Sequence, residues 1–357
     1  MPTLFSPLQL RDVQLRNRIG VSPMCQYSSV DGFANDWHLV HLGSRTVGGA
    51  GLVMAEATAV TPEGRISPQD LGLWKDEQIE MLARIFRFIA AQGAVPAVQL
   101  AHAGRKASTA PPWEGGHAVS EADGGWRPIY GPSASAFDLG DIMPHEIDVT
   151  GIRNVVEAFA KAAQRALTAG ARMIEIHAAH GYLLHEFLSP LSNQRTDEYG
   201  SSFENRTRAT REVVRAVRTV WPERLPLLVR ISATDWVEGG WDADQSVELA
   251  RELKRLGVDM IDCSSGGAVP NARIPIAPGY QVPFAERIRR EADLATAAVG
   301  MITSPEQANE LITNGRADMI FMAREFLREP YWPLKAAVHL GGTAQVPIQY
   351  GRAFVSR

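Results

Sequence analysis

Apolar runs of strand length alternate with amphipathic stretches eight times along the 357 residues of this chain. Such alternation indicates parallel strands joined by helices, because each parallel connection has to cross one face of the sheet. Eight repeats of one unit predict an α/β fold, a single closed (β/α)₈ TIM barrel rather than an open doubly wound sheet. The expected strands are residues 19–22, 52–55, 94–100, 173–177, 227–231, 260–263, 296–299 and 319–322.

The stretches between these strands carry helix signals at several boundaries. Ser304 and Pro305 supply a cap and a first-turn proline, and Gly170 and Gly257 follow expected helix ends, where glycine is favoured. The expected helices are residues 37–47, 76–92, 152–169, 205–220, 243–256, 283–292, 305–313 and 325–339. Each expected strand is thus followed by a helix.

Two long irregular stretches interrupt this rhythm, residues 103–150 after the third strand and 178–204 after the fourth. Barrel enzymes build their active sites from the loops at the carboxyl ends of the strands, so these loops are expected to form walls of a substrate pocket. Residues 8–16 predict a hairpin that caps the opposite end of the barrel. The chain exceeds the roughly 250 residues of a bare barrel, and residues 1–357 are expected to form one domain with insertions.

The charge and cysteine content of the chain narrow the class of partner. A net charge of −4, with 36 Lys and Arg residues scattered among 40 Asp and Glu residues, gives no basic stripe, so nucleic acid is not an expected partner. No apolar run reaches the roughly 18 residues of a membrane span, and no membrane partner is expected. Two cysteines, Cys25 and Cys263, do not suggest a disulfide framework and fit a reducing cytoplasm. We therefore expect a cytoplasmic protein that acts on a small molecule.

Polar residues stand where most of the expected strands end. Arg230 lies inside an apolar strand, where a charge is costly unless something anionic meets it. One interpretation is a structural ion pair with an acidic residue such as Glu175 or Glu56. The other is an arginine beside a cofactor that becomes negative on reduction, as a flavin does. Gln99, in the third strand, would suit a ring edge that presents a donor and an acceptor, although a buried glutamine can equally be a satisfied core amide.

The loops after the seventh and eighth strands contain the residues that a phosphate site needs. Gly300 would let backbone N–H groups approach a ligand, and Arg324 would offer a bidentate guanidinium. Phosphate sites in such barrels often use these two loops. The alternative is an exposed arginine at the start of a helix, but the place of Arg324 after the eighth strand favours phosphate.

The segment after the fourth strand carries two imidazoles and a phenol, in His177, His180 and Tyr182. The histidines could bind a metal ion, alone or with His38 and His41, which would favour a metal-dependent hydrolase on the same fold. No carboxylate or cysteine stands at ligand spacing nearby, so no metal is expected. The imidazoles could instead donate hydrogen bonds to one carbonyl oxygen while the phenol delivers a proton to the carbon α to it. The spacing alone does not fix the reaction.

Motifs in a fixed order extend over nearly the whole chain. They include Asn17-Arg18-Ile19, Ser22-Pro23-Met24-Cys25-Gln26-Tyr27, Asp36-Trp37-His38, Glu56-Ala57-Thr58, Gln99-Leu100-Ala101-His102-Ala103-Gly104-Arg105-Lys106, His177-Ala178-Ala179-His180-Gly181-Tyr182, Glu204-Asn205-Arg206 and Arg324. The set resembles the old yellow enzyme family, in the bacterial branch that carries a cysteine near its flavin.

This resemblance implies FMN, held non-covalently across the carboxyl ends of the strands. The residues implied to contact the ring system are Ser22, Pro23, Met24, Cys25, Ala57, Gln99 and Arg230, and those implied to hold the phosphate are Gly300, Ala323 and Arg324. Cys25 would tune the flavin potential and the substrate affinity; otherwise it is a small buried hydrophobe.

The same resemblance implies an ene-reductase, which uses NADPH to reduce the activated C=C bond of α,β-unsaturated carbonyl compounds. His177 and His180 would bind the substrate oxygen, Tyr182 would donate the proton, and Tyr27 would line the pocket and hydrogen-bond the ligand. Nitro compounds are a further class of acceptor. A related FMN barrel with an iron–sulfur cluster is not expected, because two distant cysteines cannot ligate one.

Members of this branch often close the pocket with an arginine from a neighbouring subunit. Arg352, in a tail of about residues 341–357, resembles that arginine and would reach the next subunit of a homodimer or homotetramer; the alternative is a disordered end. Two residues depart from the family pattern. Ala323 stands where many relatives have glycine, which adds a methyl group next to the phosphate. Ser201 interrupts the usual Tyr-Gly-Gly-Ser pattern in a substrate loop, which leaves the specificity open.

Overall fold

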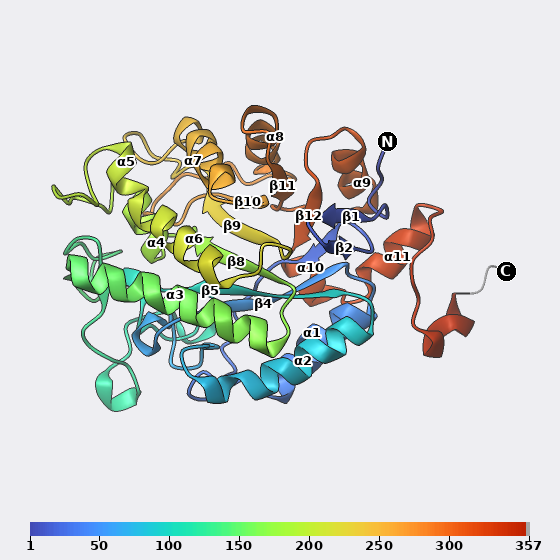
Figure 1. Cartoon of the computed structure of the whole chain (residues 1–357), viewed down its shortest axis with the longest axis horizontal. Helices are drawn as coiled ribbons and strands as arrows, with labels where there is room; N and C mark the ends of the chain where they lie inside the picture. Colours follow the sequence, from blue (N-terminus) through green and yellow to red (C-terminus); the bar gives the residue numbers. More distant parts are fainter. Residues whose placement is uncertain (355–357) are drawn as a thin grey trace.

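The computed structural model describes residues 1–354 and contains one closed barrel. Its parallel strands pair in the order β10-β11-β12-β3-β4-β5-β8-β9, and β10 also pairs with β9. The strands are β3 (Ile19–Val21), β4 (Leu52–Ala59), β5 (Val95–Ala101), β8 (Met173–Ala178), β9 (Leu227–Ser232), β10 (Met260–Ser264), β11 (Ala295–Ala298) and β12 (Met319–Met322). The predicted (β/α)₈ barrel is therefore confirmed, and Figure 1 shows its strands enclosed by helices.

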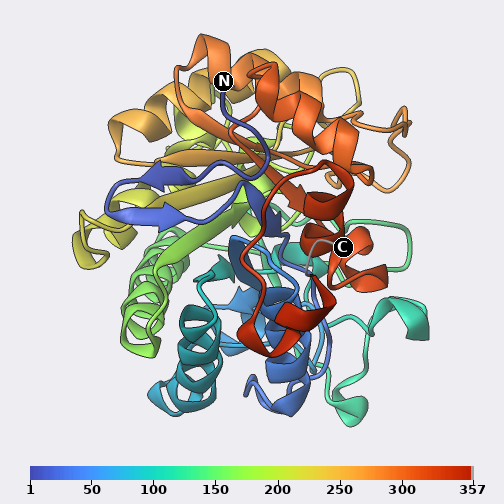
Figure 2. The same ribbon diagram turned by 90° about the vertical axis from the view of Figure 1, so that its right-hand side faces the viewer.

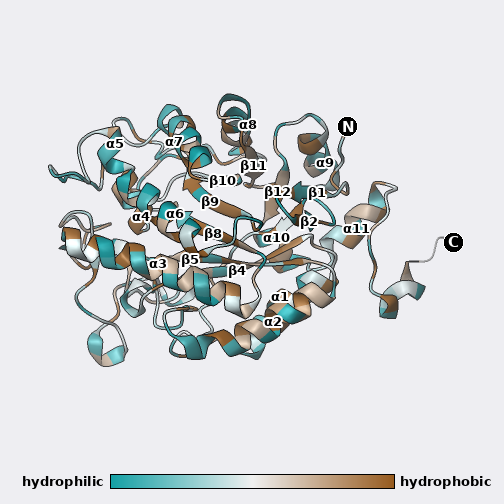
Figure 3. Ribbon diagram, viewed as in Figure 1, coloured by the Kyte–Doolittle hydropathy of each residue, from teal (hydrophilic) through white to brown (hydrophobic). Residues whose placement is uncertain are grey.

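Helices cover the outside of the barrel with their apolar faces turned inward. In α2, for example, Leu82, Ile85, Phe86 and Ile89 follow helical spacing and are buried. Figure 3 shows mostly hydrophobic strands at the centre and mixed hydropathy on the surrounding helices. The helices are α1 (Asp36–Val47), α2 (Ile79–Ala91), α3 (Val149–Ala169), α4 (Leu183–Leu188), α5 (Phe203–Arg206), α6 (Arg208–Val220), α7 (Ala243–Arg255), α8 (Val282–Glu291), α9 (Pro305–Thr313), α10 (Arg324–Arg328) and α11 (Trp332–His339).

The N-terminal hairpin is present and consists of β1 (Leu8–Leu10) and β2 (Val13–Leu15), which pair antiparallel. It lies at the amino ends of the barrel strands. The Arg11 Nε atom donates to the Oδ1 atom of Asp259, next to the start of β10, at 2.6 Å. Arg16 donates to the carbonyl oxygen of Ala50, shortly before β4, through Nε and Nη2. The hairpin thus closes the end of the barrel that faces away from the loops after the strands.

The two long loops contain more regular structure than their sequences indicate. The first carries β6 (Tyr130–Gly131) and β7 (His145–Glu146), which pair in parallel. The second contains α4, all six residues of which are buried. The first loop also contains short 3₁₀ turns at Gly104–Lys106, Pro112–Glu114 and Glu121–Asp123. Elsewhere in the chain, such turns occur at Pro62–Gly64, Asp76–Gln78 and Ile348–Ala353.

Two expected helices are interrupted. The stretch expected to form a helix over residues 205–220 breaks at Thr207 into α5 and α6. The stretch expected over residues 325–339 breaks between α10 and α11, because Pro330 has no N–H to donate and the backbone at Glu329 is extended, with φ −136° and ψ 86°.

The C-terminal segment lies on the outside of the barrel. Figures 1 and 2 show the chain after α11 running over the surface and away from the strands. Within residues 1–354, this segment makes one contact between aromatic rings. It joins Tyr350 to Tyr331, with the ring centroids 6.0 Å apart. Residues 355–357 of the predicted tail lie outside the described part of the chain. Within residues 1–354, no helix has both the length and the apolar character needed to cross a bilayer.

Candidate active site

Three aromatic rings meet at the carboxyl end of β8. His177 is the next-to-last residue of that strand, and His180 and Tyr182 follow in the loop. The ring centroid of His177 lies 5.2 Å from that of His180 and 5.1 Å from that of Tyr182, with the rings edge to face. The structure therefore brings the three predicted side chains into one cluster.

A tight turn positions this cluster. His180 and Gly181 both have left-handed backbones, with φ of 61° and 73°. A β carbon on Gly181 would lie 2.0 Å from the carbonyl oxygen of Gly267, so glycine is required there. Lys106 donates from Nζ to the carbonyl oxygens of His180 and Gly267, at 2.7 Å in each case. The lysine thus ties the turn to the loop after β10.

The surroundings of the cluster set the protonation of its members. Burial, and next the Arg230 cation, hold the pKa of His177 and of His180 well below the usual value. Burial raises the pKa of the Tyr182 phenol well above its usual value. At neutral pH the imidazoles are therefore uncharged, and each can donate one hydrogen bond, while the phenol keeps its proton. Such a set can hold an oxygen atom and supply a proton beside it.

A cavity of about 210 Å³, here called the substrate cavity, opens at Tyr182, whereas His177 and His180 lie behind that ring and do not line it. Tyr182 and Tyr27, the two phenols predicted to contact the ligand, both line it. Arg105 and Lys106 line it as well, and neither was predicted to be a site residue. Both stand in the quoted motif that begins at Gln99, and that motif is the signal that could have identified them.

A second cavity of about 450 Å³, here called the cofactor cavity, contains four of the predicted FMN residues: Arg230, Gly300, Ala323 and Arg324. Gly300 has φ +122°, and a β carbon there would lie 3.0 Å from the Nε2 atom of Gln281. Within residues 1–354, Arg324 is exposed and makes no ion pair. One guanidinium and a glycine for a phosphate, with a second guanidinium for a ring that becomes negative, fit FMN.

Arg230 has a protein partner as well as a place in the cofactor cavity. Its Nε atom lies 3.1 Å from the Oδ2 atom of Asp262, which stands opposite it on β10. The expected ion pair with an acidic residue is therefore present, but the partner is Asp262 rather than Glu175 or Glu56, because the register of β9 and β10 places Asp262 opposite Arg230. Arg230 also donates from Nη1 to the Ser22 hydroxyl at 3.2 Å. An ion pair and a cofactor contact are thus compatible at this residue.

A hydrogen bond to Glu175 holds the Gln99 side chain in the barrel interior. Its Nε2 atom donates to the Oε1 atom of Glu175 at 2.7 Å, and the side chain is 1% exposed. One N–H and the amide oxygen of Gln99 remain for another partner. Ala57 stands opposite Gln99 on β4, directly after a register shift that follows Ala55. Gln99 and Ala57 therefore lie side by side on adjacent strands.

The segment after β3 passes along the same end of the barrel. Ser22 is buried, whereas Pro23, Met24 and Cys25 are half-buried. Removal from water, with the carboxylates of Asp70 and Glu56 nearby, holds the pKa of the Cys25 thiol well above its usual value. The thiol is therefore protonated at neutral pH and is a weak nucleophile there.

The hydrolase alternative lacks a ligand set. His38 and His41 lie in α1, and the His38 Nε2 atom is 3.3 Å from the Oε1 atom of Glu56. The Nε2 atom of His180 lies 2.6 Å from the Ser264 hydroxyl. Across residues 1–354, no three His, Cys, Asp or Glu side chains come together in a way that could hold a metal ion.

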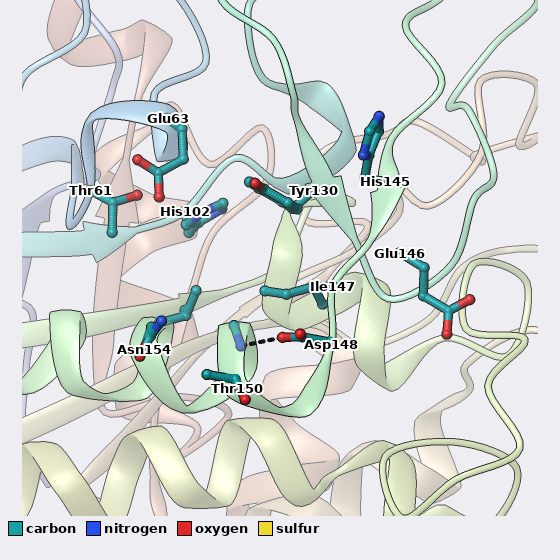
Figure 4. Close-up of a pocket in the computed structure, with 12 residues that line it drawn as sticks. Thr61, Glu63, His102, Tyr130, His145, Glu146, Ile147, Asp148, Thr150 and Asn154 are labelled. Carbon is teal, nitrogen blue, oxygen red and sulfur yellow. Dashed lines mark hydrogen bonds between the residues drawn. The ribbon is translucent and has the colours of Figure 1, made fainter.

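A third cavity, of about 470 Å³, is lined by none of the predicted site residues. It is formed by the first turn of α3, the β6–β7 pair and the loop after β4, and Figure 4 shows Glu63, His102 and Asn154 around it. The Nδ1 atom of His102 accepts a hydrogen bond from the Gly104 N–H at 3.1 Å. This histidine therefore braces the loop after β5.

Three further residues that the sequence singled out are Arg352, Ala323 and Ser201. Arg352 is exposed in the C-terminal 3₁₀ turn and, within residues 1–354, has no ion pair. Ala323 has φ −108°, which is outside the left-handed region that favours glycine. Ser201 has φ +67°, and its hydroxyl donates to the carbonyl oxygen of Arg195 at 3.1 Å, which helps to hold the turn.

Comparison with known proteins places the chain in a family. Residues 3–342 match the model of the NADH:flavin oxidoreductase / NADH oxidase family. The chain is 51% identical to the NADPH dehydrogenase of Halalkalibacterium halodurans, with 99% of each chain covered. It is 48% identical to the NADPH dehydrogenase of Bacillus subtilis strain 168, with 98% of this chain and 99% of that protein covered.

A solved structure of morphinone reductase has the same fold. It superposes with a TM-score of 0.79 at 28% sequence identity, over 96% of this chain and 91% of that one. The match over the full barrel and the cavity that fits FMN agree with the family model. The chain belongs to the old yellow enzyme family of FMN-dependent NADPH oxidoreductases.

Proposed function

We propose that this enzyme is an ene-reductase, which transfers reducing equivalents from NADPH to the activated C=C bond of α,β-unsaturated carbonyl compounds. The observation that carries the proposal is the cluster of two neutral imidazoles and one protonated phenol beside the substrate cavity. This set can bind one carbonyl oxygen and protonate the carbon next to it.

His177 and His180 would donate hydrogen bonds to the carbonyl oxygen of the substrate. The Nδ1 atom of His177 is buried, and within residues 1–354 it has no hydrogen-bond partner. In the tautomer that carries its proton on this nitrogen, His177 would gain a hydrogen bond from an incoming oxygen without giving up an existing one. Both rings are neutral, so they polarise the carbonyl as hydrogen-bond donors rather than as cations.

Tyr182 would supply the proton from its hydroxyl to the α carbon. Bound FMN would accept a hydride from NADPH and deliver it to the β carbon of the substrate. Arg230, at the edge of the cofactor cavity, would stabilise the negative charge that reduction brings. The side chains thus divide the work into carbonyl binding, proton donation and charge stabilisation.

Two further features belong to the same proposal. Nitro compounds are acceptors of a second class, because two hydrogen-bond donors can bind a nitro oxygen as they bind a carbonyl oxygen. The enzyme is a homodimer or homotetramer in which Arg352 completes the substrate cavity of a neighbouring subunit. The exposed position of Arg352, outside the cavities of its own chain, supports this assignment.

The proposal is tested by separating the two half-reactions of a Tyr182→Phe variant under anaerobic conditions. Reduction of the flavin by NADPH should proceed as in the wild type. Reoxidation by an enone such as 2-cyclohexenone should slow by about 10²- to 10⁴-fold, the usual contribution of a general acid. Stopped-flow absorbance of the flavin measures both rates.

Tyr199→Phe serves as the matched control. Tyr199 is also buried, and its hydroxyl donates to Glu212 rather than to any group of the site. That variant should keep both half-reactions. If Tyr182→Phe reoxidises as fast as the control, Tyr182 is not the acid; if enones never reoxidise the wild-type flavin, the enzyme is not an ene-reductase.

A further inference from the structure

Two acidic residues lie buried behind the groups that face the FMN ring. Glu175 on β8 and Asp262 on β10 are both 0% exposed. Asp262 is the ion-pair partner of Arg230, and Glu175 accepts the hydrogen bond of Gln99. Paired residues of adjacent strands point to the same face of a sheet, so this group of four shares the barrel interior.

The charges of this group do not balance if every member ionises. Two carboxylates and one guanidinium would leave one uncompensated negative charge in a water-free interior. Within residues 1–354, the Oε2 atom of Glu175 and the Oδ1 atom of Asp262 have no hydrogen-bond partner that could stabilise that charge.

The directions of the pKa shifts of Glu175 and Asp262 agree with this balance of charges. Burial, and next the Asp262 carboxylate, raises the pKa of Glu175 well above its usual value, although Arg230 and Gln99 oppose the shift. Burial raises the pKa of Asp262 to about 6, and Arg230 opposes this shift too. At neutral pH one of the two carboxyl groups therefore keeps a proton.

We propose that Glu175 and Asp262 act as one acid pair that holds a single negative charge and a single proton, and that this pair, acting through Arg230, sets the reduction potential of bound FMN. The inference rests on the proposed placement of the FMN ring beside Arg230. The pair and Arg230 together are neutral, so the reduced ring meets a guanidinium whose charge is largely compensated. Glu175 and Asp262 are positioning residues, since they act through Gln99 and Arg230.

A shared charge has a distinctive consequence for substitutions. Glu175→Gln leaves Asp262 to carry the charge. Asp262→Asn removes the repulsion that adds to the effect of burial on Glu175 and leaves Arg230 without its ion-pair partner, so in our proposal Glu175 ionises and replaces Asp262. Each single variant therefore keeps one negative charge behind Arg230. Only the double variant leaves the guanidinium uncompensated, and a free positive charge favours the reduced flavin.

The test compares the reduction potential of FMN in the wild-type holoenzyme, both single variants and the double variant. At a fixed applied potential, the ratio of reduced to oxidised FMN should change by less than about threefold in each single variant and rise by more than about tenfold in the double variant. Asp259→Asn, which removes a carboxylate directly before the amino end of β10, should match the wild type.

Infrared spectroscopy provides a measurement that does not depend on the double variant folding. The wild-type holoenzyme at pH 7 should have a C=O band from the protonated member of the pair, and both single variants should lose it. A band lost only in Glu175→Gln, or a potential shift already complete in Asp262→Asn, would show that the charge resides on Asp262 alone and would overturn the proposal.

Unchanged potentials in all three variants would also overturn it, because the pair would then have no influence on the flavin. These results are separable from the proposed function. Failure of the wild type to bind FMN with a measurable potential would remove the premise, whereas bound FMN with additive shifts would contradict only the shared charge.

Discussion

Asp70 is a buried carboxyl in the loop after β4, and it makes the stability of the protein depend on pH. The side chain is 2% exposed, and its Oδ2 atom accepts a hydrogen bond from the Ile66 N–H at 2.6 Å. Burial, and next the Glu56 carboxylate, raises the pKa of Asp70 to about 8. The folded state therefore binds a proton that the unfolded state releases at a lower pH.

From this shift we predict that the free energy of unfolding falls as the pH rises from about 7 to about 8, a window above the usual pKa of histidine, because the lowered pKa values of buried histidines have the opposite effect at lower pH. The unfolded chain binds fewer protons than the folded one in this window, and each such group contributes a slope of up to about 1.4 kcal/mol per pH unit. Asp70→Asn keeps the acceptor for Ile66 and should flatten the profile. Urea unfolding of the holoenzyme at several pH values measures the slope.

Part of the slope should remain in that variant, because the pKa of Glu186 is also raised to about 8, again chiefly by burial. An exposed carboxyl provides the control, and Asp138→Asn should follow the wild-type profile. A profile for Asp70→Asn that is as steep as the wild type would mean that Asp70 is already ionised in the folded protein.

Arg230 illustrates what a sequence can and cannot predict at the scale of a residue. An arginine inside an apolar strand predicts an anionic partner nearby, and one is present. The identity of the partner depends on the register of β9 against β10, which places Asp262 opposite Arg230. Asp262 itself lies in an apolar strand, and the same reasoning could have found it. The register, by contrast, is set by contacts between distant segments and has no local signal.

At the scale of elements, the N-terminal hairpin is predicted to belong to the cooperative fold. Leu15, on β2, is 0% exposed and forms part of the main hydrophobic core. Leu15→Ala should reduce the free energy of unfolding by about 2–5 kcal/mol, the usual cost of such a truncation in a core. The flavin spectrum at low temperature should not change, because the hairpin lies at the opposite end of the barrel from the site.

Gln14→Ala is the control, since Gln14 is exposed on the same strand. Chemical unfolding monitored by circular dichroism compares the two variants with the wild type. A loss below about 1 kcal/mol in Leu15→Ala would indicate that the hairpin frays independently of the barrel.

Most strands could be predicted from the sequence, because a buried parallel strand is apolar on both faces and stands out as a run. Helices were predicted where one face is apolar, and α9 has the predicted bounds. The short helix α4 was missed for the opposite reason. All its residues are buried, so it has no polar face and no helical periodicity. The break before α11 could have been predicted from Pro330.

At the scale of the whole molecule, the C-terminal segment and the substrate cavity of the same chain are separate. The substrate cavity is lined by residues that extend from Tyr27 to Tyr182, and the C-terminal 3₁₀ turn contributes none of them. Arg352 is exposed on a segment that leaves the body of the barrel (Figure 1). A second subunit is therefore the natural recipient of this side chain in our proposal, and the sequence could indicate this only through the family resemblance.

Complementation between inactive subunits tests the assignment. Arg352→Ala removes the arginine and leaves Tyr182 intact, whereas Tyr182→Phe removes the acid and leaves Arg352 intact. In a mixed dimer, an arginine that acts in trans reaches from the Tyr182→Phe subunit into the site of the Arg352→Ala subunit, and one complete site is restored. Mixtures refolded or co-expressed at equal ratio should therefore reduce enones faster than either variant alone. An arginine that acts within its own chain would restore no site, and the mixed sample would then show only the average of the two parents.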